Sequence, residues 1–132
     1  QIQDLGLNGL VSFINELPHE KVLEIVSISD LFILPSVEEG ISNAVLEAMA
    51  LGTPVITTDC GGMTEVIKNG INGFIVPVRD SRALQQTIED FIRIEKENKI
   101  KIIANAQKTI RENFLLDKQI DNMESFYRNS IR

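Results

Sequence analysis

The feature that most limits the fold of this chain is the alternation of short apolar segments with segments of helical periodicity over its first 80 residues. Each apolar segment is bounded by proline, glycine or asparagine, as strands commonly are. The run Leu31–Leu34 is continuously apolar and stops at Pro35, which is typical of a strand buried on both faces. The pattern predicts strands over Leu10–Ile14, Leu31–Leu34, Pro54–Thr58 and Phe74–Val76, and helices over His19–Ser29, Ser42–Leu51 and Met63–Lys68. This order predicts an α/β fold, a Rossmann-like parallel sheet with flanking helices.

Beyond Pro77 the strand pattern gives way to apolar stripes at helical spacing. The stripes comprise Leu84, Thr87, Ile88, Phe91 and Ile92, then Ile103, Ala106, Ile110 and Phe114, and finally Ile120, Met123, Phe126 and Tyr127. They predict C-terminal helices that close the fold. We therefore interpret residues 1–132 as a single domain, in which 1–80 form a strand-and-helix core and 81–132 form C-terminal helices.

Composition excludes several classes of protein. Hydrophobic residues make up 43% and charged residues 24% of the chain, the usual globular mix, which excludes a disordered chain. No apolar run approaches the roughly 20 residues needed to cross a bilayer. The single cysteine, Cys60, cannot form an internal disulfide and fits a reducing, cytoplasmic compartment. The only histidine, His19, is interpreted as a surface residue at a helix start, and no spacing resembles a set of metal ligands.

The charge is unevenly distributed along the chain. Residues 1–90 carry four Lys/Arg against thirteen Asp/Glu, whereas residues 91–132 carry nine against six. The acidic body excludes a non-specific nucleic-acid surface, because phosphate neutralisation needs clustered basic side chains. The basic C-terminal third is compatible with contact with an anionic membrane surface, although solvated helix faces give the same count.

Segment 35–43 leaves a predicted strand and enters a predicted helix, which is where ligands bind in parallel sheets. Gly40 removes a side chain where the backbone must turn, and the amides of Ile41, Ser42 and Asn43 then lie at the helix N-terminus. Unpaired amides and the helix dipole there favour a phosphate. An ordinary helix capped by Ser42 or Asn43 has the same signature, so this feature alone does not separate the two interpretations.

Two glutamates, Glu39 and Glu47, lie eight positions apart on either side of this helix start. The neighbours of Glu47 in the sequence are alanine and other apolar residues. Carboxylates are rarely buried in apolar surroundings unless they are paired or hydrogen-bonded. With phosphates at the helix N-terminus, Glu47 is placed to accept hydrogen bonds from ribose hydroxyls. Glu39 then faces whatever lies beyond the phosphates.

A second glycine-containing loop follows the strand Pro54–Thr58. Gly61 and Gly62 permit either a close approach of the backbone to a ligand or simply a tight strand–helix connection, and the sequence favours neither. Cys60 lies beside them without an apparent base that would make it a nucleophile.

Together these motifs resemble the retaining glycosyltransferases of family 4, the glycosyl transferases group 1. The matching strings are Asp30–Ser36, Glu39-Gly40, Leu46-Glu47-Ala48-Met49-Ala50, Gly52–Ile56, Gly61-Gly62 and Glu65-Val66-Ile67. The resemblance is strong over about residues 1–80 and falls in the C-terminal, donor-binding domain of a two-Rossmann-domain (GT-B type) architecture. By this resemblance Glu39 is the catalytic glutamate near the anomeric carbon, and Glu47 binds the ribose.

The resemblance further implies that Gly40, Ile41, Ser42 and Asn43 hold the diphosphate through their amides, and that Gly61 and Gly62 lie beside the donor pocket. Family members often have glycine where this chain has Ser42, which lacks glycine's backbone freedom. The implied reaction transfers a hexosyl unit from a nucleotide-diphosphate sugar to a glycan or lipid-linked acceptor, with retention and without metal or cofactor. The implied setting is polysaccharide biosynthesis in the cytoplasm, with contact of the parent enzyme with the inner face of the membrane.

Other interpretations remain open at this point. A nucleotide-sugar epimerase or a phosphorylase shares this architecture, and a non-catalytic nucleotide-binding module retains only its fold. The Glu-x7-Glu spacing and the Glu-Ala-Met-Ala context favour the transferase.

The resemblance also implies that the chain is the latter part of the domain. It makes Leu10–Ile14 the third strand and Leu31–Leu34 the fourth, and assigns the strands between them and the acceptor-binding N-terminal domain to sequence outside this chain. Exposed central strand edges invite pairing, so we expect a repacked sheet or a homodimer. The chain alone is expected to carry part of the donor site and to be inactive.

Overall fold

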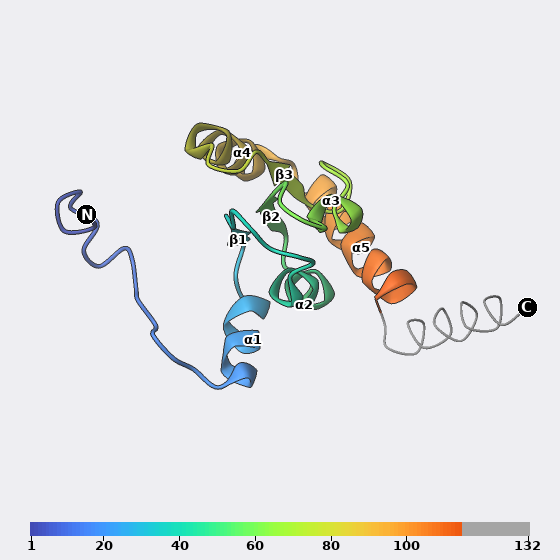
Figure 1. Ribbon diagram of the computed structural model, residues 1–132, viewed down its shortest axis with the longest axis horizontal. Coiled ribbons are helices and arrows are strands. Elements are labelled where there is room, and N and C mark those ends of the chain that lie inside the picture. The colour runs from blue at the N-terminus through green and yellow to red at the C-terminus, as the bar shows by residue number, and fades with distance from the viewer. Residues whose placement is uncertain (115–132) are drawn as a thin grey trace, which may run out of the picture.

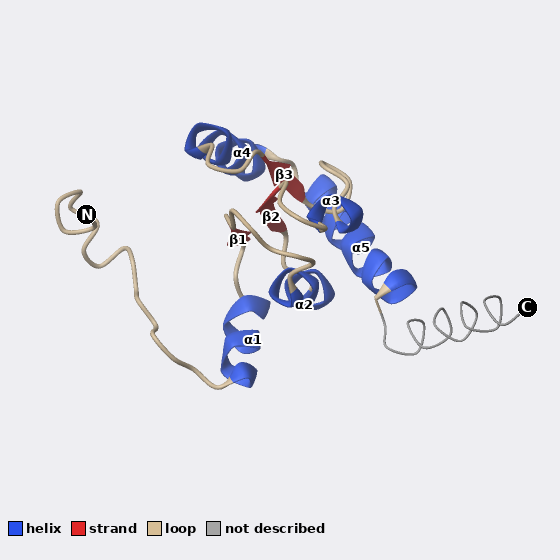
Figure 2. Ribbon diagram, viewed as in Figure 1, coloured by secondary structure: helices blue, strands red, loops and turns tan. Residues whose placement is uncertain are grey.

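A computed structural model describes residues 1–114. Its elements are α1 (His19–Ser27), β1 (Phe32–Leu34), α2 (Asn43–Leu51), β2 (Val55–Thr58), α3 (Met63–Val66), β3 (Phe74–Val76), α4 (Ser81–Arg93) and α5 (Lys96–Asn113). The strands form a parallel sheet in the order β1-β2-β3, with Ile33 opposite Ile56 and Thr57 opposite Ile75. Helices surround the sheet (Figures 1 and 2), so the predicted parallel sheet with flanking helices is confirmed.

The core lies between the central strand and the helices that follow it. Every residue of β2 is buried, because this strand is paired on both edges and covered on both faces. Met49 of α2 and Met63 of α3 are fully buried in the same apolar cluster, where Ala106 and Ile110 of α5 join them. Burial of these side chains is the main stabilising term for the fold.

Helix α2 begins and ends where its sequence indicates. Ser42 occupies the N-cap position with an extended backbone, and its carbonyl accepts a hydrogen bond from the Leu46 amide at 3.1 Å. The Ser42 side chain makes no capping hydrogen bond, so the cap is provided by backbone geometry alone. Gly52 ends the helix in the left-handed conformation, with φ of 83°, which glycine adopts without strain.

A buried asparagine ties the turn before β3 to the last described helix. Asn72 donates hydrogen bonds to the Val66 carbonyl and to the Thr109 hydroxyl, both at 3.0 Å. Its side-chain oxygen accepts a hydrogen bond from the Lys68 amide at 2.7 Å. Both polar atoms of the side chain are therefore hydrogen-bonded, as is usual for a buried amide.

The predicted strand Leu10–Ile14 is wrong. These residues belong to an arm, residues 1–17, that extends from the body in Figure 1, and Leu10 and Phe13 are 81% and 78% exposed. Within residues 1–114 the arm makes only one isolated bridge, between Asn8 and Val11. A strand needs a neighbour for its backbone groups, and no described strand lies beside this one. This segment does not enter the sheet of the described residues, and the other expected outcome, a homodimer, stays a prediction.

Three smaller predictions also need correction. β1 is half-buried rather than buried on both faces, because within the described residues it pairs only with β2. α3 ends at Val66 rather than Lys68, since Ile67 already has an extended backbone. Ile92, placed in an apolar stripe, is 68% exposed. The stripe over 120–127 lies outside the described residues.

Candidate functional site

The loop between β1 and α2 is attached to the central strand by two threonine hydroxyls. Thr57 Oγ1 donates to the Leu34 carbonyl at 2.9 Å, and Thr58 Oγ1 donates to the Ser36 carbonyl. Both threonines are buried, so the end of β1 and the first residue beyond Pro35 are held by the most buried strand. The loop that carries Glu39 therefore begins from a fixed point.

Glu39 is half-buried at the carboxyl end of the sheet. The Ser36 hydroxyl donates a hydrogen bond of 2.9 Å to Glu39 Oε2. This bond orients the carboxylate within its own loop and spreads part of its charge onto a hydroxyl dipole.

The two glycine-containing loops are in direct contact. Gly61 has a φ of 53°, and a Cβ added to it would lie 1.6 Å from the Glu39 carbonyl oxygen. A Cβ on Gly62 would lie 2.7 Å from Ile41 Cγ1. The close approach that these glycines allow is therefore to the backbone and side chain of the neighbouring loop. Contact of Gly61 and Gly62 with a ligand stays a prediction.

The structure does not support the interpretation that Gly40 is needed for the backbone to turn. Its φ is not in the left-handed region, and a Cβ added there would meet no atom within 4 Å. The protein's own geometry thus does not require glycine at this position. Instead the absent side chain leaves open space beside the start of α2.

The N-terminus of α2 follows directly. Ser42 is the N-cap and Asn43 the first helical residue, so the first helical amides have no partner within the helix. The first turn of α2 contains no acidic side chain that would compete for these amides. The arrangement suits an anion, for which the helix dipole adds attraction.

Glu47 lies one turn into α2, and its side chain is 38% exposed. Its Oε1 lies 3.1 Å from Nε2 of His19, the first residue of α1. Sequence reasoning placed His19 on the surface, where it is indeed 64% exposed, but missed this partner. No local pattern could have found it, because the contact depends on the packing of α1 against α2.

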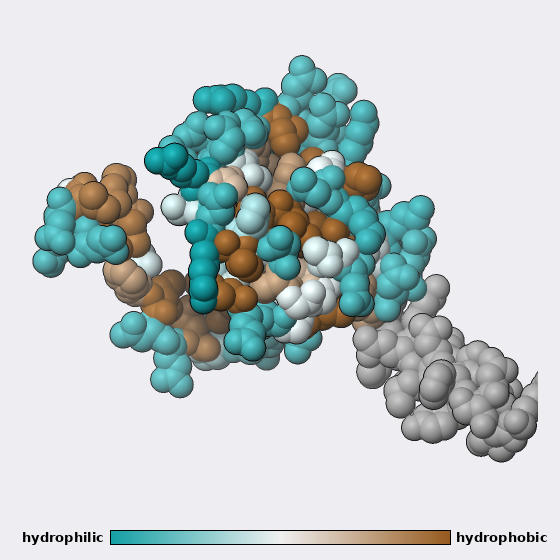
Figure 3. Space-filling model, turned by 45° about the horizontal axis from the view of Figure 1, so that its top comes forward, coloured by the Kyte–Doolittle hydropathy of each residue, from teal (hydrophilic) through white to brown (hydrophobic). Residues whose placement is uncertain are grey.

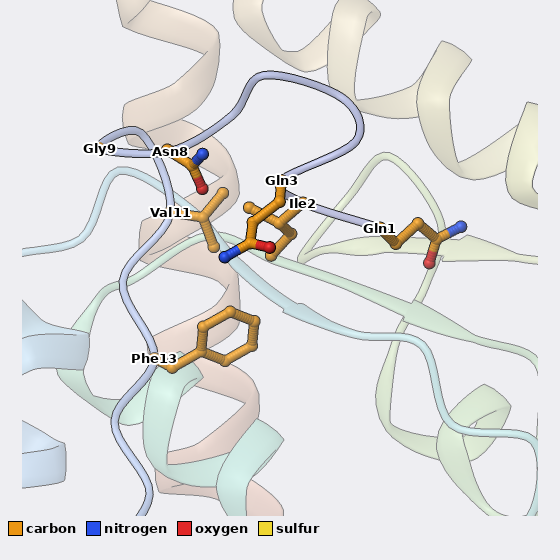
Figure 4. A pocket seen from close by; sticks show the side chains of 7 residues that line it. All are labelled: Gln1, Ile2, Gln3, Asn8, Gly9, Val11 and Phe13. Atoms are coloured by element: carbon orange, nitrogen blue, oxygen red, sulfur yellow. The ribbon is translucent and has the colours of Figure 1, made fainter.

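Of the hollows on the surface of residues 1–114, two bear on the predicted site. One, of about 210 Å³, lies at the carboxyl ends of the strands between the loop after β1 and the start of α4, where Arg79 has a φ of 59°. The other, of about 570 Å³, is lined only by arm residues and contains none of the predicted site residues (Figure 4). Hydrophobic side chains are exposed along the same arm in Figure 3. The predicted site residues therefore lie outside this larger hollow, in the loops and the helix start that follow the strands.

Residues 1–114 contain no cluster of metal-ligating side chains, and their cysteine is buried. No group of three or more His, Cys, Asp or Glu could hold a metal ion in this part of the chain. Cys60 is buried, with its sulfur 3.4 Å from the Thr58 hydroxyl. No helix in the described part is both long and apolar enough to cross a membrane.

A parallel sheet with flanking helices, in which α2 begins shortly after the carboxyl end of β1, defines a Rossmann-like α/β protein as a class. The family model described as "Glycosyl transferases group 1" matches residues 1–109. The chain belongs to this family, as its motifs predict, and its GT-B type fold is confirmed by structural matches, of which three are given below.

Relatives and solved structures agree with this assignment. A putative colanic acid biosynthesis glycosyltransferase of Escherichia coli K12, WcaL, is 30% identical over 93% of this chain and 31% of its own length. Crystal structures of Anabaena Alr3699/HepE with UDP and with UDP-glucose are 27% identical, with a TM-score of 0.82, over 94% of this chain and 34% of that one. The C-terminal domain of a Francisella tularensis group 1 protein, LpcC, shares the fold at 23% identity, with a TM-score of 0.74 over 87% of this chain and 59% of that domain. The chain thus spans about a third of the length of the curated relatives it matches.

Proposed function

We propose that this chain forms part of the donor site of a retaining glycosyltransferase, which transfers a hexosyl unit from a nucleotide-diphosphate sugar to a glycan or lipid-linked acceptor in polysaccharide biosynthesis. The observation that carries the proposal is the placement of Glu39 and Glu47 on either side of the α2 N-terminus at the carboxyl edge of the sheet. The UDP and UDP-glucose complexes of the Anabaena protein support a donor of this class.

In the proposed mechanism the diphosphate lies against the amides of Ile41, Ser42 and Asn43. Those amides neutralise the negative charge that grows on the leaving group, without a metal ion or another cofactor. The open space at Gly40 admits the phosphates close to the backbone. Glu39 then faces the donor sugar, where its carboxylate orients the ring and favours positive charge at the anomeric carbon.

Glu47 holds the nucleoside in this proposal. A single carboxylate oxygen can accept two hydrogen bonds, so Glu47 can bind the 2′- and 3′-hydroxyls of a ribose together. Glu47 lies in α2 one turn beyond the amides that are proposed to bind the diphosphate. The acceptor is bound by a part of the enzyme outside this chain, so the chain alone is inactive. The enzyme works in the cytoplasm and meets lipid-linked acceptors at the inner face of the membrane.

Calorimetric titration of the full-length enzyme with uridine and guanosine diphosphates tests the ribose assignment. Glu47→Ala should weaken the nucleotide that binds by about tenfold, as expected for lost charge-assisted hydrogen bonds. Glu112→Ala, an exposed glutamate on α5, is the matched control and should change nothing. Failure of both nucleotides to bind, or equal affinity in Glu47→Ala and the wild type, contradicts the assignment.

A second measurement separates a transferase from a module that only binds nucleotides. Glu39→Ala should lower turnover by about 100-fold or more while the affinity for the diphosphate changes little, since Glu39 is proposed to act on the sugar. Glu38→Ala, the exposed neighbour, is the control. Comparable losses of turnover and affinity in Glu39→Ala indicate a binding role only.

A further inference from the structure

The contact between His19 and Glu47 joins two helices at the proposed ribose site. His19 Nε2 and Glu47 Oε1 are 3.1 Å apart, and both side chains are partly open to solvent. Only one carboxylate oxygen is used in this contact. Within residues 1–114, no hydrogen bond or ion pair uses the other oxygen, Oε2, and the Glu47 side chain as a whole is 38% exposed.

Hydrogen bonds at both ends of α1 fix the position of His19. Pro18 occupies the N-cap position, and its carbonyl accepts hydrogen bonds from the Lys21 and Val22 amides, so the helix starts at a defined residue. At the other end of α1, the Thr53 hydroxyl donates 2.7 Å to the Val26 carbonyl. Because Thr53 is buried directly after α2, α1 is fastened to the end of the helix that carries Glu47.

We infer that His19 is a positioning residue: it fixes the Glu47 carboxylate so that this group presents Oε2 to the ribose of the donor. The inference rests on the proposed function and assigns a role to a residue outside the loop and helix that form the site. A glutamate side chain free in water samples several rotamers, and an ordering contact in the unbound protein lowers the entropy lost on binding. The first turn of α1 also provides a positive helix end near the carboxylate.

The test measures preference for ribose hydroxyls in the full-length enzyme. The nucleoside diphosphate that binds more tightly is compared with its 2′,3′-dideoxy analogue. The dissociation constant of the analogue divided by that of the nucleoside diphosphate reports contacts to those hydroxyls. His19→Ala should lower this ratio by about 3–5-fold, the scale of a partly exposed polar pair. His19→Gln should restore most of it, since its amide nitrogen reaches a position similar to Nε2. Lys21→Ala, on the same exposed helix, is the control.

Three outcomes distinguish the role of His19 from the proposed binding of ribose by Glu47. If Glu47→Ala leaves the ratio unchanged, the ribose assignment itself fails. If Glu47→Ala abolishes the preference while His19→Ala leaves it intact, only the role of His19 is overturned. If His19→Ala weakens both nucleotides equally, His19 acts on structure or on another part of the ligand, and the inference is again overturned.

A double substitution completes the design. His19→Ala added to Glu47→Ala should cause no further loss of preference, because a positioning residue has no effect once its target is gone. A further loss would assign His19 a contact with the ribose that is independent of Glu47, contrary to the inference. His19 is largely exposed and makes no core contact, and thermal unfolding of each variant checks that the fold is retained.

Discussion

Replacing Gly61 by alanine should separate the two loops of the site. The added Cβ would lie 1.6 Å from the Glu39 carbonyl oxygen, whereas side-chain Cβ atoms essentially never come closer than 3.0 Å to such an atom. The loops must therefore part by at least about 1.4 Å, the difference between those distances. The obstructing atom is backbone, so rotation of a side chain cannot relieve the contact.

The substitution has two separable costs. The left-handed φ of 53° costs alanine about 1–2 kcal/mol, and the overpacking adds about 1–3 kcal/mol. Gly70→Ala is a matched control, because Gly70 also has a positive φ, of 76°, but a Cβ there would meet nothing within 4 Å. Urea unfolding should thus place Gly61→Ala below Gly70→Ala in stability by about 1–3 kcal/mol.

The two variants should differ more clearly in activity. A displacement of about 1 Å at a catalytic group can cost about 100-fold in rate, so Gly61→Ala should lower the turnover of the full-length enzyme by that order. Glu47 is outside the displaced loop, so the preference for ribose hydroxyls should persist in the same variant. Equal stability and equal turnover in Gly61→Ala and Gly70→Ala would refute the loop contact as the reason for glycine at position 61.

Three further predictions concern stability and are all measured by urea unfolding of the chain. Met49→Ala should lose about 2–5 kcal/mol, because Met49 is completely buried in the core, and a smaller loss would mean that the neighbours collapse into the space. Asn72→Leu should lose about 2–4 kcal/mol, because it leaves the Lys68 amide and Val66 carbonyl without their partner, and an unchanged midpoint would argue against those bonds. Phe13→Ser should change stability by less than about 0.5 kcal/mol, because this arm residue is exposed, whereas a large loss would place it in a core.

The parts of the fold that sequence predicts are those in which local and tertiary signals agree. The bounds of α2 follow from Ser42 and Gly52, and the buried strand after it follows from Pro54 and a β-branched run. Each of these signals is local, and the tertiary structure reinforces it by burial. The segment Leu10–Ile14 has an equally good strand composition but forms none, because strand formation depends on a neighbour as well as on the segment.

In the candidate site, too, the sequence predicts what is local and misses what depends on tertiary packing. The sequence predicts that Glu39, Gly40 and the start of α2 lie together, since they are adjacent in the chain. It leaves open whether Gly61 approaches a ligand or the protein, and the structure answers that its Cβ position is filled by the Glu39 backbone. The contact of His19 with Glu47 has no sequence signal at all, because it arises from two helices packed side by side.

Glu39 and Glu47 consequently depend on elements of different rigidity. The loop of Glu39 is attached to β2, in which every residue is buried, through the hydroxyls of Thr57 and Thr58. The Glu47 side chain instead contacts α1, in which no residue is fully buried. Local opening is easier for elements with few buried contacts, so α1 can move at a smaller free-energy cost than β2. On the proposed roles, disturbance of α1 should therefore alter nucleotide affinity before it alters the chemical step, and only changes that reach β2 should act on Glu39 first.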